Sequence, residues 1–188
     1  MSARDDWPGR ARGVRSRQWP ALIALADRVA ASETLEGLVL IGSFASGTPD
    51  ELSDIDVIAV AMAGRFDAAW AERHRLSEEA LAAWDLRPKP GYQVHNWLTR
   101  DLVKVDCTIV DPDLGSKDLA EPFVVLVGTP SVADRFPRGT LETVRERARQ
   151  ISEEQERQRV DPATMDYGEL IDWKIAELKS AVRRAPRR

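Results

Sequence analysis

The sequence has 188 residues, 43% of them hydrophobic, which is enough for one core without metal or disulfide cross-links and so for one domain, with or without an appendage. Its net charge of −4 conceals an acidic body: residues 1–18 and 183–188 hold nine arginines against two aspartates, whereas 19–182 hold eighteen basic and twenty-nine acidic residues. This acidic composition disfavours a general binder of nucleic-acid backbones. The single cysteine, Cys107, excludes a disulfide framework and a thiolate zinc site. No apolar run reaches the ~20 residues of a membrane span.

The N-terminal half of the chain is predicted to alternate helices and strands after a loose arm. Residues 1–16 have no apolar periodicity and no apolar segment typical of a secretory signal, so we expect an arm on a cytoplasmic protein. A turn at Pro49-Asp50 separates two runs rich in valine and isoleucine, which are typical of buried strands. Apolar spacing predicts helices over 19–31, 43–47 and 66–84 and strands over 35–41 and 54–62.

The C-terminal half predicts further strands and then two helices. Asp161-Pro162 is a good helix start, with aspartate as the cap and proline at the first helical position. The apolar stripe of the helix that follows leaves open whether it packs on the body of the protein or on a second copy in a homodimer. Strands are predicted over 92–98, 103–110 and 123–127, and helices over 140–159 and 163–184. The resulting division is a loose arm (1–16), an α/β domain (17–130) and a C-terminal helical extension (131–188).

The residues that suggest chemistry begin at the turn after the first predicted strand. The strand ends at Gly42, and the short helix predicted from Ser43 would present free backbone N–H groups and a hydroxyl that suit phosphate oxygens. On the next strand, Asp54 and Asp56 are two residues apart, so both carboxylates leave the same face. Carboxylates at that spacing repel each other unless a cation lies between them.

A third carboxylate, Asp106, lies on the strand predicted at 103–110, on the same face as Lys104 and Thr108. Each feature alone has an ordinary structural explanation: a serine-capped turn, a charge at a strand edge, an acid paired with Lys104. Three carboxylates combined with a phosphate-holding turn instead suit two hard cations, Mg²⁺ or Mn²⁺, and phosphoryl transfer.

Gly42-Ser43, ten intervening residues and Asp54-Ile55-Asp56 resemble the signature of the DNA polymerase β-like nucleotidyltransferase superfamily, whose third acid corresponds to Asp106. The resemblance covers about residues 20–110, and the antibiotic adenylyltransferases and minimal nucleotidyltransferases are the nearest members in size. It implies a small mixed β-sheet flanked by helices and transfer of a nucleoside monophosphate, AMP from ATP above all, to an acceptor hydroxyl with release of pyrophosphate. It also implies roles: Asp54 and Asp56 bind two Mg²⁺ ions, Asp106 binds the catalytic ion and acts as general base, and Gly42 and Ser43 hold the triphosphate.

The turn departs from this pattern in one respect. Many minimal members carry an arginine shortly before the second glycine, whereas this chain has Phe44-Ala45-Ser46 before Gly47. The charge of the triphosphate is therefore expected to be met elsewhere, by Lys104 or Arg65.

His95 is a further candidate, through the pairing of the strands predicted at 92–98 and 103–110. Pairing Leu98 with Val103 separates apolar from polar side chains best, and it places His95 and Trp97 on the face of Asp106. His95 would then orient Asp106 or contact the acceptor. The alternative is a partly exposed strand histidine without such a role.

The acceptor is inferred only by class. An acidic body favours a small cationic acceptor, such as an aminoglycoside-like antibiotic, over nucleic acid, and no membrane partner is expected. Two alternatives stay open. One is adenylylation of a partner protein, as by antitoxin-type nucleotidyltransferases. The other is a catalytically silent nucleotide-binding or structural module with its C-terminal helices as the interaction surface, to which the missing turn arginine points.

Overall fold

The computed structural model describes residues 18–86, 91–111, 113, 119–120, 122–136, 138–140, 142, 146 and 166–184. The strands are β1 (Leu35–Ile41), β2 (Ile55–Ala61), β3 (Ala82–Asp85), β4 (Tyr92–Leu98), β5 (Lys104–Val110), β6 (Leu119–Ala120), β7 (Val124–Val127) and β8 (Arg138–Gly139). The helices are α2 (Gln18–Ala30), α3 (Gly42–Ser46), α4 (Phe66–Ala71), the 3₁₀ helix η1 (Arg73–Ser77), α5 (Ser131–Asp134) and α7 (Tyr167–Arg184).

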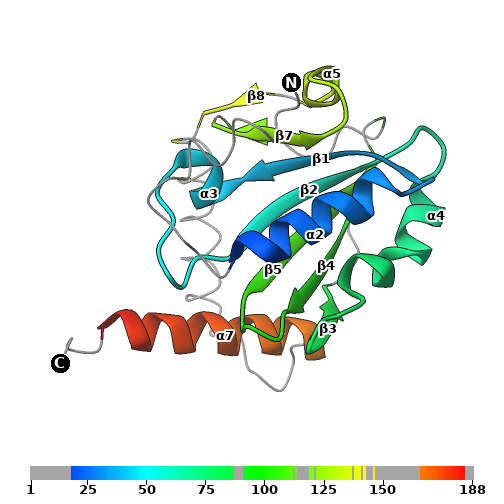
Figure 1. The fold of residues 1–188 in the computed structure, drawn as a ribbon. Coiled ribbons are helices and arrows are strands. Elements are labelled where there is room, and N and C mark those ends of the chain that lie inside the picture. The colour runs from blue at the N-terminus through cyan, green and yellow to red at the C-terminus, as the bar shows by residue number, and fades with distance from the viewer. Residues whose placement is uncertain are drawn as a thin grey trace.

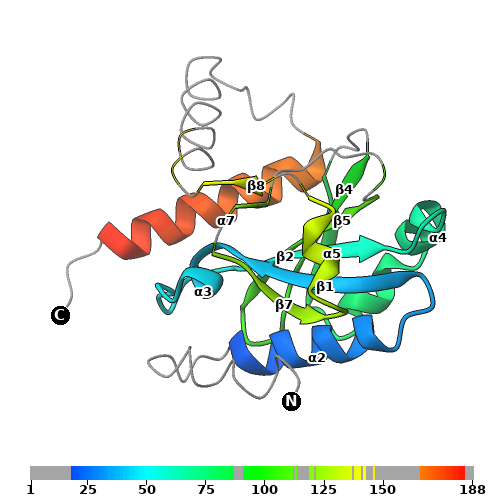
Figure 2. The ribbon, with the colours of Figure 1, turned by 90° about the horizontal axis from the view of Figure 1, so that it is seen from above.

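A six-stranded sheet with the order β3-β4-β5-β2-β1-β7 forms the centre of the molecule (Figure 1). β2 and β5 are parallel and the other neighbours are antiparallel, while β6 and β8 form a separate parallel pair. Helices lie on both faces of the sheet, as Figure 2 shows for α2 and α7. The predicted α/β class with a mixed sheet is confirmed.

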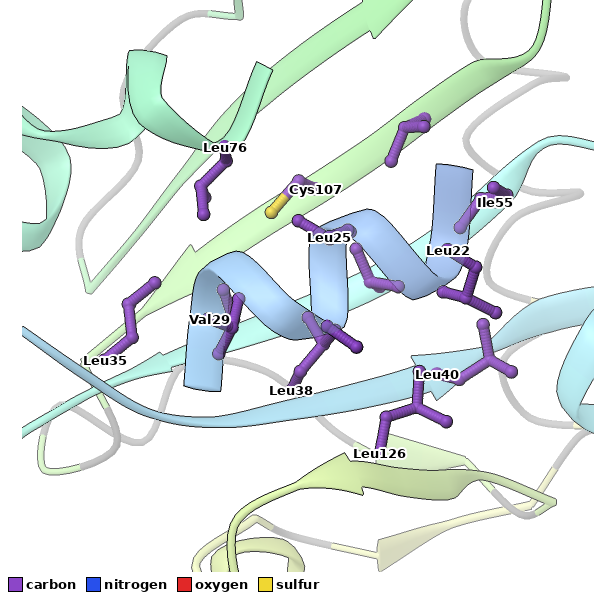
Figure 3. Close-up of a cluster of buried hydrophobic side chains, with 14 of the residues drawn as sticks. Leu22, Leu25, Val29, Leu35, Leu38, Leu40, Ile55, Leu76, Cys107 and Leu126 are labelled. Carbon is purple, nitrogen blue, oxygen red and sulfur yellow. The ribbon is translucent and has the colours of Figure 1, made fainter. Parts of the chain in front are cut away.

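One face of the sheet is covered by α2 and holds the larger part of the core. Leu22, Leu25 and Val29 recur along one side of α2 and are at most 2% exposed. They lie over Leu38 and Leu40 of β1 (Figure 3). Burying each such side chain contributes about 1.5–3 kcal/mol, so this stripe is what holds α2 on the sheet.

The opposite face is divided between an apolar part and a polar part. Val39, Ile58 and Val60 form the apolar part together with Val132 and Phe136 from the region of α5. The polar part comes from the strand ends nearer β3, and α7 lies on this side of the sheet (Figure 2). Successive side chains of β2 point to opposite faces of the sheet, so the side chain of Asp56 lies on this second face with Ile58 and Val60.

The prediction of one helix over 66–84 is wrong. The segment forms the short α4 and η1 and then turns into β3, in which Trp84 pairs with Asn96 of β4. Pairing with the edge of the sheet overrides the high helix propensity of Ala82 and Ala83. This correction brings Trp84 from a predicted helix face to the polar face of the sheet.

The other predicted elements fall into two groups. The helices and strands predicted at 19–31, 35–41, 43–47, 54–62, 92–98, 103–110 and 123–127 are present with boundaries shifted by no more than one residue, and the helix predicted at 163–184 is present as α7 from Tyr167 to Arg184. The predicted arm at 1–16 lies outside the described residues, as do most of the helix predicted at 140–159 and the helix start predicted at Asp161-Pro162. Within the part of the chain that is described, no helix combines the length and apolar character needed to cross a membrane.

Candidate functional site

A row of side chains crosses the polar face of the sheet over four adjacent strands. Asp56 of β2 is the direct partner of Asp106 in the parallel β2/β5 ladder. Asp106 is in turn opposite Asn96 of β4, and Asn96 is opposite Trp84 of β3. Residues paired in register point to the same face and their strands lie about 5 Å apart, so the two carboxylates are neighbours. The fold therefore brings together two of the acids that the sequence analysis assigned to one site, Asp56 on β2 and Asp106 on β5.

The turn after β1 passes directly over Asp56. Gly42 has φ +71°, a backbone conformation that side chains other than glycine rarely adopt. A Cβ built on Gly42 would lie 2.3 Å from Oδ2 of Asp56, so the close approach of the turn to this carboxylate also requires glycine. Ser43 follows inside the first turn of α3, whose N-cap is Ile41 rather than the serine. The five-residue α3 supplies little helix dipole, so the weight of the site rests on the carboxylates and on Gly42.

Replacing Gly42 with alanine is expected to displace the Asp56 carboxylate. The positive φ alone should lower the free energy of unfolding by about 1–2 kcal/mol. Gly47→Ala is a matched control, because Gly47 has φ +72° but a Cβ there would meet nothing within 4 Å. Urea unfolding should show this loss in both variants and a further loss in Gly42→Ala, whose Cβ must displace the Asp56 carboxylate. Mn²⁺ binding and transferase activity should fall only in Gly42→Ala. Equal loss of both activities in Gly47→Ala would contradict the role given to Gly42.

The loop before Asp54 is fixed by two polar residues. Gln18 at the start of α2 is 2% exposed and donates from Nε2 to the carbonyl oxygens of Glu51 and Ser53, at 3.3 and 3.2 Å. Asp50 accepts from the backbone N–H of Leu52 at 3.0 Å and from the Ser53 hydroxyl at 2.9 Å, which confirms a turn at Pro49-Asp50. Asp54 therefore leaves an ordered loop at the start of β2.

Two lysines lie against the acids of this face. Nζ of Lys104 is 2.7 Å from Oδ1 of Asp106, so the ordinary pairing considered from the sequence is present, and it is also 3.1 Å from Oδ1 of Asp172 on α7. Lys179, also on α7, forms an ion pair with Asp54. Burial lowers the pKa of Lys104, but the charges of Asp106 and Asp172 and the hydrogen bonds to them outweigh it, so the pKa is raised. Lys104 is therefore a fixed positive charge.

Asp172 attaches α7 to three neighbouring strands. Its carboxylate accepts from Nε1 of Trp84 at 2.9 Å, from Nδ2 of Asn96 at 3.1 and 3.2 Å, and from Lys104. Near the start of α7, a Cβ on Gly168 would lie 2.2 Å from the carbonyl oxygen of Asp85, so the helix and β3 are in backbone contact. The inner side of α7 is thus largely polar, whereas Leu178 of the predicted apolar stripe is 65% exposed.

The donor chemistry of the row fits a hard divalent cation. Asp54, Asp56 and Asp106 offer carboxylate oxygens, and the buried Oδ1 of Asn96 has no hydrogen-bond partner within the described part of the chain. In that same part, no three acidic, histidine or cysteine side chains are gathered closely enough to hold a metal as they stand. Instead, lysine ammonium groups form ion pairs with Asp54 and Asp106. The ligand types therefore fit Mg²⁺ or Mn²⁺, and binding requires rearranged side chains.

The expected neighbourhood of His95 and Asp106 is wrong. Leu98 pairs with Lys104 rather than with Val103, so His95 is opposite Cys107 and its ring is on the core face, 0% exposed. Trp97, opposite Val105, is buried on that face too. The residue beside Asp106 is Asn96, for which the one-residue shift of the register is responsible.

His95 instead belongs to a buried network on the core face. Its Nδ1 is 2.7 Å from Oδ1 of Asp85, and its Nε2 is 2.8 Å from the hydroxyl of Ser77. Asp85 also accepts from Nε and an Nη of Arg73. Burial tends to raise the pKa of Asp85, yet the hydrogen bonds from Arg73 and His95 and the charge of Arg73 lower it. Burial, together with the nearby charges of His74 and Arg73, lowers the pKa of His95 more than the hydrogen bond and charge of Asp85 raise it. The ring is therefore neutral at pH 7, donating to Asp85 and accepting from Ser77.

The pH dependence of stability should report this histidine. Since the pKa of His95 is lower in the folded than in the unfolded state, its contribution is complete above the unfolded value near 6.5 and is lost as the pH falls towards the folded value. The free energy of unfolding of the native protein, measured with urea, should therefore decrease below about pH 6.5, by up to ~1.4 kcal/mol per pH unit. His95→Asn should show a shallower slope. An unchanged slope in His95→Asn would refute the assignment.

Comparison with models of known protein families and with curated proteins finds no match to this chain. The site therefore stands on its own geometry. Of the residues singled out from the sequence, Gly42, Asp56 and Asp106 come together, with Asp54 two residues before Asp56. Sequence reasoning missed Asn96, Asp172 and Lys179, since contacts 76 and 125 residues apart leave no local signal.

Proposed function

We propose that the protein is a metal-dependent nucleotidyltransferase that transfers a nucleoside monophosphate, most simply AMP from ATP, to an acceptor hydroxyl. The observation that carries the proposal is the side-by-side placement of Asp56 and Asp106 on parallel strands, with the Gly42 turn packed against Asp56. Neighbouring carboxylates in a sheet repel each other and lower the stability of the fold unless a cation binds between them. The mixed sheet and the resemblance of the Gly42-to-Asp56 segment support the nucleotidyltransferase fold as part of this proposal.

Each residue then has a chemical task. Asp54 and Asp56 would hold two Mg²⁺ ions, Asp106 would be the third ligand, and the bound ions would neutralise the phosphate charge. Asp106 would also accept the proton of the acceptor hydroxyl. The acceptor oxygen forms a bond to the α-phosphorus as the bond from that phosphorus to the bridging oxygen breaks, and pyrophosphate leaves. Gly42 and Ser43 would contact the β- and γ-phosphates.

Arg65, which the sequence suggested as a partner for the charge of the triphosphate, lies too far from Asp54 and Asp56 for this role. It follows the opposite end of β2 from Asp54, and the seven residues of that strand span roughly 20 Å. Lys104 is already bonded to two carboxylates on the polar face.

The acceptor class follows from charge. Residues 19–182 carry eleven more acidic than basic residues, which favours a small cationic acceptor such as an aminoglycoside-like molecule. Exposed Tyr167, Leu178 and Val182 on α7 favour a second candidate, adenylylation of a partner protein that binds this helix.

Incubation with labelled ATP, GTP, CTP and UTP, Mg²⁺ and a panel of acceptors tests the proposal, with pyrophosphate release and label on the acceptor as readouts. The panel holds aminoglycosides, neutral sugars and a cell protein extract. Metal-dependent transfer to a cationic sugar is the expected result, and labelling of one protein favours the second candidate. Calorimetry that finds no binding of Mg·NTP would contradict both and support the structural form of the silent module.

A further inference from the structure

We propose that Lys179 is the phosphate-binding cation of this site: it neutralises Asp54 when no divalent cation is bound and moves to the phosphates of the nucleotide when one binds. The inference rests on the proposed function and extends it to α7. It also supplies the positive charge that the turn 43–48, Ser-Phe-Ala-Ser-Gly-Thr, does not contain.

The position of Lys179 is set by the attachment of α7 to the sheet. Gly168, Asp172, Ile175 and Lys179 follow one another at spacings of four, three and four residues, so they share one side of the helix. Asp172 is anchored by three strands, and Lys179 follows it by seven residues, or roughly 10 Å along the axis. The anchor therefore delivers the lysine to the start of β2, where Asp54 lies.

Lys179 and Lys104 are held differently. Lys104 lies between the carboxylates of Asp106 and Asp172, and its side chain is 8% exposed. The side chain of Lys179 is 17% exposed, and that of its partner Asp54 is 26% exposed, so solvent and solutes reach this pair more readily. A lysine has a flexible four-carbon stem, which lets the ammonium group change partner while the helix stays attached.

Electrostatics makes the change of partner necessary. A divalent cation bound to Asp54 would share this carboxylate with the ammonium group of Lys179, and like charges so close together repel strongly in a partly buried site. The phosphates that arrive with the cation are acceptors for the displaced ammonium. Lys179 therefore competes with a free metal ion but cooperates with a metal–nucleotide complex.

Lys179→Met tests whether the lysine has these opposite effects on the binding of a free metal ion and of a metal–nucleotide complex. Binding of Mn²⁺ alone, followed by electron paramagnetic resonance of the free ion, should become several-fold tighter because the competing charge is gone. Binding of Mg²⁺ with a non-hydrolysable ATP analogue, followed by calorimetry, should weaken roughly tenfold or more. Lys179→Arg should keep nucleotide affinity within a few-fold of the native protein. Lys174→Met is the matched control, since Lys174 pairs with Glu177 on the exposed side of α7.

The outcomes separate the two proposals. A native protein that binds no Mg·nucleotide contradicts the proposed function and Lys179 with it. A native protein that binds it while Lys179→Met binds equally well contradicts Lys179 alone. Weaker binding of both Mn²⁺ and nucleotide would mean that Lys179 only supports the fold, and a lowered unfolding midpoint relative to Lys174→Met would accompany that result.

Discussion

Asp56→Asn should abolish nucleotidyl transfer while the protein stays folded. Asp56 is the carboxylate that both the Gly42 turn and Asp106 adjoin, so losing its charge removes the ligand that the site is arranged around. We expect at least a roughly 10³-fold fall in kcat, equivalent to about 4 kcal/mol of transition-state stabilisation. Removing one of two neighbouring like charges should change the free energy of unfolding by less than ~1 kcal/mol.

Pyrophosphate release under saturating Mg·ATP measures the effect, and urea unfolding checks the fold. Asp67→Asn is the matched control, because Asp67 is exposed in the first turn of α4 beyond the far end of β2. That variant should keep native activity. Full turnover by Asp56→Asn in the presence of Mg²⁺ would exclude the two-cation mechanism, whatever reaction the protein catalyses.

The parts of the fold that could be predicted are those with local periodicity. The runs at β1 and β2 are apolar on both faces, as strands covered on two sides must be, and α2 carries its apolar residues along one side. Gly42 and the Asp54-Ile55-Asp56 triplet lie at the ends of these two strands. The local pattern therefore identified these residues, but it did not predict the antiparallel pairing of β1 with β2, which brings the two ends together and places Gly42 beside Asp56.

The β4/β5 register could not be predicted from polarity. The loop at 99–103 includes Leu102 with φ +58°, which propensities do not anticipate for leucine, and the extra residue shifts every pairing by one. The polar/apolar rule also assigned His95 to the polar face. It is buried in the core instead, because Ser77 and Asp85 satisfy both ring nitrogens.

The role of α7 could not be predicted either, because here an apolar pattern concealed a polar attachment. Its apolar stripe suggested a packing face, yet Asp172 attaches it through the polar groups of Trp84, Asn96 and Lys104. Those partners become neighbours only after β3, β4 and β5 have paired. A polar attachment of this kind depends on tertiary order and has no periodic signature in the sequence.

Lys104→Met should be the most destabilising of the single replacements considered. The lysine is the shared cation of Asp106 and Asp172, whose side chains are 27% and 24% exposed. Removing it leaves two partly buried carboxylates without that partner, which should lower the free energy of unfolding by about 2–4 kcal/mol, somewhat less than for fully buried pairs. Since its pKa is raised in the fold, the contribution is complete below the unfolded value near 10.5 and is lost only as the pH rises through the folded value.

A double-mutant cycle in urea separates the ion network from simple loss of packing. Asp172→Asn keeps an oxygen to accept from Trp84 but removes the charge, so combining it with Lys104→Met should cost at least ~1 kcal/mol less than the sum of the single variants. Lys174→Met, which breaks an exposed pair, should cost under ~0.5 kcal/mol. Additive effects of Lys104→Met and Asp172→Asn would mean that α7 is held by packing, and the delivery of Lys179 to Asp54 would then no longer depend on Asp172.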